Sequence, residues 1–164
     1  MAATYFQNVN IVDATGKAPF LGCVLVDGER IKSVKVGPPE TQSPDVKIVD
    51  GEHQLYLMPG LIESHAHLSI DNTDDLAALG AIPVEEHTLM TMYNAKLYLD
   101  HGITSCISAA SAKPRLDLVI RNAINEGKIP GPRLLAATPW LTVTGGLGDM
   151  RTLHQPYIES MAMM

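Results

Sequence analysis

The hydrophobic pattern of the chain changes near residue 57, and this change constrains the fold more than any other feature. Before it, short segments alternate apolar and polar residues, which indicates β-strands. After it, apolar strand-like segments are separated by stretches with a helical period. Strands that alternate with helices favour parallel pairing in an α/β domain. The sequence therefore predicts a β segment over residues 1–57 and an α/β segment over residues 58–164.

The first segment contains several short strands and a hairpin. Asp27-Gly28 stands between two of them, where a two-residue turn needs residues that tolerate a positive φ. Pro38, Pro39 and Pro44 interrupt any strand ladder in the stretch after the hairpin, which predicts a loop there. The expected strands are Thr4 to Val12, Gly22 to Val26, Arg30 to Val36 and Val46 to Val49.

The second segment contains two expected helices between apolar strands. Residues 85–100 contain neither glycine nor proline, and Gly102 suits the position just past a helix end. Pro114 suits a first helical turn, and Gly127 suits the end of that second helix. One buried stripe of the second helix would contain Leu116, Val119, Ile120, Ala123 and Ile124. The expected strands are Leu55 to Met58 with Gly60 to Ile62, Ile103 to Ile107 and Leu134 to Ala137.

Composition and charge limit the classes of function. The net charge of −6 repels polyanions, so we expect a small-molecule substrate and no nucleic acid partner. No apolar run approaches membrane-spanning length, and the first residues lack a signal-peptide pattern, so we expect a cytoplasmic protein with no membrane partner. Cys23 and Cys106 lie far apart in dissimilar contexts, which predicts buried thiols and no disulfide.

Two histidines, His65 and His67, stand at the end of the first apolar strand after Pro59-Gly60. Residues two apart on a strand share a face, so both imidazoles can reach one metal ion. Alternating α/β folds also bind their ligands at this end of their strands. Six histidines at random would give such a pair in roughly one case in five, so a surface pair or a structural core histidine is the alternative. We interpret the pair as metal ligands.

Other polar residues have simpler explanations. By strict alternation Glu63 shares the strand face of the histidine pair, where it is either a neighbour of the ligands or solvated. His101 precedes a helix-ending glycine, so helix capping explains it. Asp149 follows a glycine-rich stretch, where local hydrogen bonds are more common than a substrate contact. The histidines without a partner at ligand spacing are His53, His87 and His154.

Several segments share a further pattern that covers most of the chain. They are Asn8 to Asp13, Pro59 to Leu68, His101 to Ser105, Arg121 to Arg133 and Leu141 to Gly146. Together they resemble the amidohydrolase superfamily of metal-dependent hydrolases, in particular its imidazolonepropionase-like and prolidase-like branch. The resemblance implies a small composite β-sandwich, assembled from both ends of a chain, beside a TIM-like (β/α)8 barrel whose first strand ends in His65 and His67.

The resemblance also implies a metal centre and a reaction. One or two divalent metals, usually zinc, are bound there, with a carboxylated lysine from the fourth strand and histidines from the fifth and sixth as further ligands. An aspartate from the eighth strand completes the set and accepts a proton from the attacking water. The implied reaction is hydrolysis of a carbon-nitrogen bond other than a peptide bond, in a small amide or cyclic amide, by a metal-activated water. A homo-oligomer of the complete enzyme is a further expectation.

The chain departs from that pattern in length and at two positions. A complete barrel takes about 250 residues, so we expect an incomplete barrel here, with the catalytic aspartate beyond residue 164. Ile107-Ser108 replaces a common Arg-Asp, and Leu147 replaces a histidine after Gly-Gly, so the substrate cannot be transferred from the branch. A catalytically incomplete fragment without activity of its own is therefore the alternative hypothesis. A barrel assembled from several chains is a third hypothesis. It is the least favoured, because the missing parts are not duplicates of those present.

Overall fold

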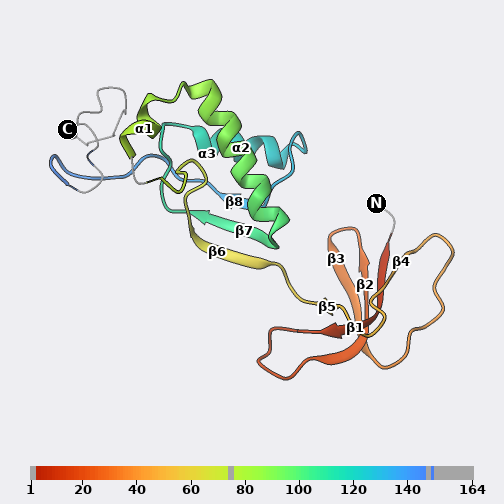
Figure 1. The fold of residues 1–164 in the computed structure, drawn as a ribbon. Coiled ribbons are helices and arrows are strands. Elements are labelled where there is room, and N and C mark those ends of the chain that lie inside the picture. The colour runs from red at the N-terminus through yellow and green to blue at the C-terminus, as the bar shows by residue number, and fades with distance from the viewer. Residues whose placement is uncertain (1–2, 74–75, 147–148, 150–164) are drawn as a thin grey trace. The chain divides into compact units, whose positions relative to one another are not determined.

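The structure is a computed structural model that describes residues 3–73, 76–146 and 149. The chain divides into two compact units, Met1–Pro59 and Gly60–Met164, drawn in Figure 1. The sequence-based division between residues 57 and 58 lies two residues before this boundary.

The first unit is a five-stranded mixed sheet with β1 at its centre. β1 (Thr4–Ile11) runs antiparallel to β2 (Phe20–Asp27), which pairs in turn with β3 (Arg30–Val36). On its other edge β1 runs parallel to β4 (Lys47–Asp50) and β5 (Tyr56–Leu57). The strands predicted before residue 50 are therefore confirmed, with β2 beginning two residues earlier than expected.

The hairpin between β2 and β3 closes one residue later than predicted. Asp27 still pairs with Arg30, so the two turn residues are Gly28 and Glu29. Gly28 has φ +59°, a conformation that glycine adopts without strain. Further along the hairpin, a Cβ atom at Gly22 would lie 2.2 Å from the carbonyl oxygen of Lys35. The two strands can approach at this point only because residue 22 has no side chain.

Apolar side chains of the first unit form a small core that leaves part of the sheet uncovered. Val9, Ile11 and Val24 are buried. A hollow of about 350 Å³ lies beside this core and is lined by Ile11, Val24, Ile31 and Val34. Ile31 and Val34 remain 67% and 48% exposed. Within the described residues this unit is one sheet, so one layer of the expected β-sandwich is present.

The second unit is a parallel three-stranded sheet in the order β6-β7-β8. Helices α2 and α3 connect its strands and lie on one face of the sheet (Figure 1). This order of strand, helix, strand, helix, strand was predicted, but the first predicted strand is divided: Tyr56–Leu57 pairs with β1 in the first unit as β5, and β6 begins only at Leu61. The short α1 was not predicted, and β8 is shorter than expected. The bounds are β6 Leu61–Ala66, α1 Leu76–Ala81, α2 Val84–Asp100, β7 Ile103–Ser108, α3 Leu116–Asn125 and β8 Arg133–Leu135.

One apolar core joins this sheet to its two helices. Cys106 of β7 and Leu134 of β8 are buried against Ala95 of α2 and Ile120 of α3. The opposite face of the sheet is open, since Ile62 is 70% and Leu135 is 66% exposed. The remaining buried members of the core are Ala66 and Leu68.

The buried stripe predicted for α3 is wrong at one position. Val119 is 42% exposed, whereas Asp117 is fully buried. The helix also begins after Pro114, because Arg115 is its N-cap with φ +71°, outside the helical region. In the first turn of this helix, the Asp117 carboxyl group is hydrogen-bonded to Ser108 at the end of β7.

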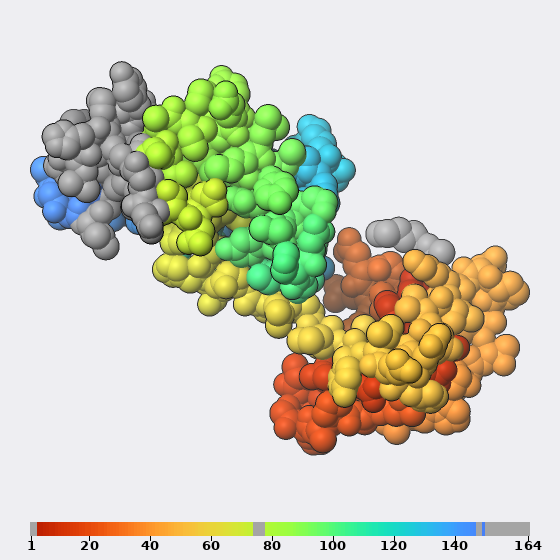
Figure 2. Space-filling model, viewed as in Figure 1, coloured from red at the N-terminus to blue at the C-terminus, as the bar shows by residue number. Residues whose placement is uncertain are grey.

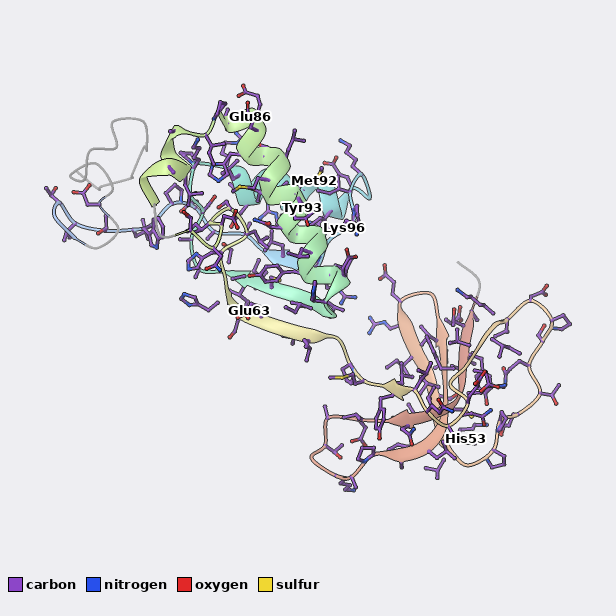
Figure 3. The ribbon with its side chains drawn as sticks, in the orientation of Figure 1. His53, Glu63, Glu86, Met92, Tyr93 and Lys96 are labelled. Carbon is purple, nitrogen blue, oxygen red and sulfur yellow. The ribbon has the colours of Figure 1, made fainter. Side chains whose placement is uncertain are left out.

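Helix α2 presents two different faces. Met92 packs against the core. Tyr93 remains 64% exposed, and Figure 3 shows it on α2 with Met92 and Lys96. Figure 2 shows α2 at the surface of its unit. His101 is the C-cap, and its Nδ1 lies 2.8 Å from the carbonyl oxygen of Leu97, which confirms the capping role.

The two cysteines are free and buried, as predicted. Burial raises the pKa of the Cys106 thiol to about 11, so this group stays protonated at neutral pH. Among the helices in the described part of the chain, none is long and apolar enough to cross a membrane.

Candidate metal centre

His65 and His67 meet at the carboxyl end of β6. Their ring centroids lie 5.0 Å apart, and the ring planes make an angle of 80°. Ala66 and Leu68 are fully buried in the core under the helices, so the alternation of the strand directs the two imidazoles to the other side. His65 is exposed and His67 is half-buried.

The ring of His67 is oriented by the loop that follows β7. Its Nδ1 atom lies 3.3 Å from the carbonyl oxygen of Ala110. Because a carbonyl oxygen can only accept, this contact requires the hydrogen on Nδ1 and leaves the Nε2 lone pair available to a ligand. The ring of Trp140, which follows β8, lies 6.2 Å from that of His67. Residues near the ends of all three strands therefore surround His67.

Glu63 does not follow the strict alternation that the sequence suggested. The pairing of β6 with β7 shifts register between Glu63 and Ala66, so a shared face with the histidines cannot be inferred from spacing. The side chain is held locally, because Glu63 Oε1 accepts a hydrogen bond of 2.9 Å from the backbone N–H of His65. Glu63 lies on β6 (Figure 3) and shapes the backbone that carries the first histidine.

The two histidines fit part of a metal site. Neutral imidazoles suit zinc and similar divalent cations, and the freed Nε2 of His67 is a suitable donor. A catalytic zinc site normally has three protein ligands. Within residues 3–73, 76–146 and 149, no group of three His, Cys, Asp or Glu side chains is arranged to hold a metal ion. His65 and His67 thus bring two imidazole donors together at this end of the sheet.

A buried polar cluster lies behind the loop that orients His67. Asp117 Oδ2 forms a short hydrogen bond with Ser108 Oγ. Ser69 Oγ accepts a hydrogen bond of 2.8 Å from the backbone N–H of Ala112 and lies 3.3 Å from Ser111 Oγ. The members of this cluster, all buried, are Ser69, His87, Ser108, Ser111 and Asp117.

The cluster contains serine, histidine and aspartate but is not arranged as a nucleophilic triad. His87 Nε2 lies 2.7 Å from the carbonyl oxygen of Ser69, so the imidazole contacts the backbone and not a hydroxyl. A nucleophile also needs access to substrate, and Ser69 and Ser111 are fully buried. Among the described buried atoms, His87 Nδ1 and Asp117 Oδ1 have no hydrogen-bond partner. The arrangement is therefore suited to holding backbone segments in place.

Sequence reasoning missed this cluster for identifiable reasons. An aspartate in the first turn of a helix ordinarily interacts with the helix dipole, so Asp117 gave no sign of its burial. His87 has no histidine or carboxylate at ligand spacing, and its contact with Ser69 crosses from α2 to the loop after β6. Asp149 behaves as predicted, since its Oδ2 accepts a hydrogen bond of 2.9 Å from the N–H of Gly145. His154 lies outside the described residues.

We predict that acidification changes the stability of the second unit in two opposite steps. Burial lowers the pKa of His87 below its ordinary value of 6.5, so between these two values the unfolded chain binds more protons. Stability should fall as the pH decreases through that window. Burial raises the pKa of Asp117 above its ordinary value of 3.8, so between these two values the folded chain binds more protons. Stability should rise as the pH decreases through this second window.

Urea unfolding of the chain across the acidic range measures both steps. His87→Gln should remove the loss of stability that begins below about pH 6.5, and Asp117→Asn should remove the gain at lower pH. Comparing each variant with the unaltered chain cancels the contributions of other carboxyl groups. A pH profile that stays parallel to that of the unaltered chain would contradict the assignment for the residue replaced.

Comparison with known proteins finds relatives by structure alone. No protein-family model matches the sequence, and no curated protein is significantly similar to it. A prolidase crystallised with N-methylphosphonate-L-proline matches 91% of this chain with 26% identity and a TM-score of 0.75. A Xaa-Pro dipeptidase with methionine in its active site matches 92% with 21% identity and a TM-score of 0.75. Phenylurea hydrolase B matches 94% with 22% identity and a TM-score of 0.72.

These neighbours are hydrolases that act on amide or other carbon-nitrogen bonds. The chain spans about a third of their length, since the matches cover 35% of the prolidase and 36% of each of the other two. The described elements accordingly correspond to part of an amidohydrolase domain, which agrees with the fold expected from the resemblance.

Proposed function

We propose that this protein is a metal-dependent amidohydrolase and that His65 and His67 are ligands of its metal, with zinc the best fit. The reaction is hydrolysis of a carbon-nitrogen bond other than an ordinary peptide bond, in a small amide or cyclic amide. The observation that carries the proposal is the histidine pair at the carboxyl end of the first parallel strand, with Nε2 of His67 left free by its contact with Ala110. The class of the structural neighbours supports the same reaction.

The residues around the pair have separate tasks in this proposal. His65 and His67 would hold the divalent cation, which would supply a water of lowered pKa and polarise a carbonyl group. Ala110 fixes the tautomer of His67, and Glu63 fixes the backbone at His65. The indole of Trp140 beside His67 offers an apolar wall, which favours a substrate with an apolar group near the scissile bond. Negative net charge and buried free thiols support a small-molecule substrate and a cytoplasmic location.

A second hypothesis is a catalytically incomplete chain. No three ligating side chains converge in the part of the chain that the structure describes, and the chain spans about a third of the neighbours. In this hypothesis the two histidines bind a cation without turnover, because catalytic zinc sites normally have three protein ligands.

One assay separates the two hypotheses. The purified chain is incubated with N-acyl amino acids, Xaa-Pro dipeptides, cyclic amides and phenylureas, once with added zinc and once with a chelator. Hydrolysis that the chelator abolishes and zinc restores would support the amidohydrolase. Zinc binding without hydrolysis would support the incomplete chain. Hydrolysis that resists the chelator and survives replacement of both histidines would overturn the metal-dependent proposal.

A further inference from the structure

Asp117 is a carboxylic acid at a fully buried position, which is unusual for this residue type. Its side chain is completely buried in the first turn of α3, and none of the ion pairs between described residues includes it. Burial raises the pKa of this carboxyl group above its ordinary value. A buried carboxyl group without a cationic partner opposes folding unless hydrogen bonds compensate for lost hydration. The contacts of Asp117 therefore call for an explanation beyond stability.

A continuous series of contacts joins Asp117 to His67. Asp117 Oδ2 is hydrogen-bonded to Ser108 Oγ, and Ser108 Oγ lies 3.3 Å from the carbonyl oxygen of Ala110. The same carbonyl oxygen lies 3.3 Å from His67 Nδ1. The series begins on α3, passes through the end of β7 and ends at the residue that follows β6.

The hydrogens available in this series limit which group donates and which accepts at each contact. The Ser108 hydroxyl carries one hydrogen, but two oxygen atoms lie within reach of it. The Ala110 carbonyl has no hydrogen to give. Ser108 Oγ can donate to Asp117 Oδ2 or to the Ala110 carbonyl, and a carboxyl group that carries the hydrogen donates to Ser108 and frees the hydroxyl to donate to Ala110. The two lone pairs of that carbonyl oxygen are then occupied by Ser108 and by the Nδ1 hydrogen of His67.

The loop that carries Ala110 is fixed on both sides. The N–H of Ala109 donates a hydrogen bond of 2.8 Å to the carbonyl oxygen of Ala66, between the two histidines. The N–H of Ser111 donates one of 3.1 Å to the carbonyl oxygen of Thr138, beyond β8. The position of the Ala110 carbonyl is thus set by neighbouring strands, and the polar series behind it sets its hydrogen bonding.

We infer that Asp117 is a positioning residue for the metal centre, acting through Ser108 and the Ala110 carbonyl to hold His67 as the tautomer whose Nε2 faces the ligand. The inference rests on the proposed function only in taking His67 as a ligand, because the tautomer itself exists without a metal. Loss of the direct partner of a metal ligand typically changes metal affinity by about 10- to 100-fold, and Asp117 acts on that partner, the Ala110 carbonyl, through Ser108.

Nitrogen chemical shifts of the His67 ring test the inference in the metal-free chain. The unaltered chain should show one tautomer, with the hydrogen on Nδ1. Ser108→Ala and Asp117→Ala should each give a mixture of tautomers. Asp117→Asn should restore the single tautomer, because the amide N–H can replace the carboxyl hydrogen. Asp100→Asn, at an exposed position on α2, is the matched control and should have no effect.

Zinc titration of the same variants gives a second measurement. Affinity should fall about 10-fold or more in Ser108→Ala and in Asp117→Ala, and it should recover in Asp117→Asn. If Asp117→Ala does not fold, the smaller change in Ser108→Ala still decides the matter. Tautomer shifts in a chain that binds no zinc would contradict the proposed ligand role of His67 and would leave the effect of Asp117 on the His67 tautomer intact. An unchanged tautomer in both alanine variants would overturn the positioning role.

Discussion

His67→Ala should abolish measurable zinc binding by the 164-residue chain, and His65→Ala should do the same. The two imidazoles are the donors that the structure brings together, with ring centroids 5.0 Å apart, and one remaining imidazole cannot hold a divalent cation against water. Replacing a ligand should therefore weaken binding by more than the roughly 100-fold loss caused by changing a neighbour of a ligand. Calorimetric titration with zinc, followed by metal analysis of the dialysed protein, measures the effect.

The matched control for both variants is His101→Ala. His101 is an exposed histidine of the same unit, and its ring contacts the carbonyl oxygen of Leu97 at the end of α2. Its replacement should leave zinc affinity unchanged. The metal assignment fails if both site variants bind zinc as tightly as this control does.

Ile120→Ala should destabilise the second unit by about 2 to 5 kcal/mol. Ile120 is 2% exposed and packs in the core where α3 meets the sheet, so the smaller side chain loses buried apolar contacts and leaves a cavity. Its neighbour Val119 is 42% exposed, and Val119→Ala should change stability by less than about 0.5 kcal/mol. Urea unfolding followed by helical circular dichroism reports on this unit, because all described helices belong to it.

The comparison between these two variants tests the packing of α3 directly. Sequence periodicity assigns Val119 and Ile120 to one buried stripe, whereas the structure buries only Ile120. Equal losses of stability in the two variants would favour the periodic pattern over the observed helix orientation.

Much of the fold was predictable because local patterns determine it. Alternation identified β1 and β3, and the absence of glycine and proline from residues 85–100 identified α2. The hairpin turn shifted by one residue because the sequence cannot tell which side of Gly28 supplies the second turn position. The pattern of α3 failed at Val119 because Asp117 is buried against Ser108, the last residue of β7, and a periodic count of apolar residues ignores such polar partners.

The candidate site was predictable only in part. The spacing of His65 and His67 singled out the pair, although their role as ligands stays a prediction. Their surroundings depend on contacts between distant segments. Ala110 lies 43 residues from His67, and its contribution comes from a backbone carbonyl that no side-chain pattern reveals. The irregularity near Glu63 is likewise invisible to an alternation rule, because it arises from the pairing of β6 with β7.

The central place of β1 in the first sheet has a consequence for how this unit is made. β1 pairs with β2 on one edge and with β4 and β5 on the other, and Gln7 meets Asp50 across 43 residues of sequence. At ribosomal rates of about 5 to 20 residues per second, Asp50 is synthesised roughly 2 to 9 seconds after Gln7. The β2–β3 hairpin can close within microseconds of its emergence. During synthesis, β1 therefore has one unpaired edge until β4 and β5 have been made.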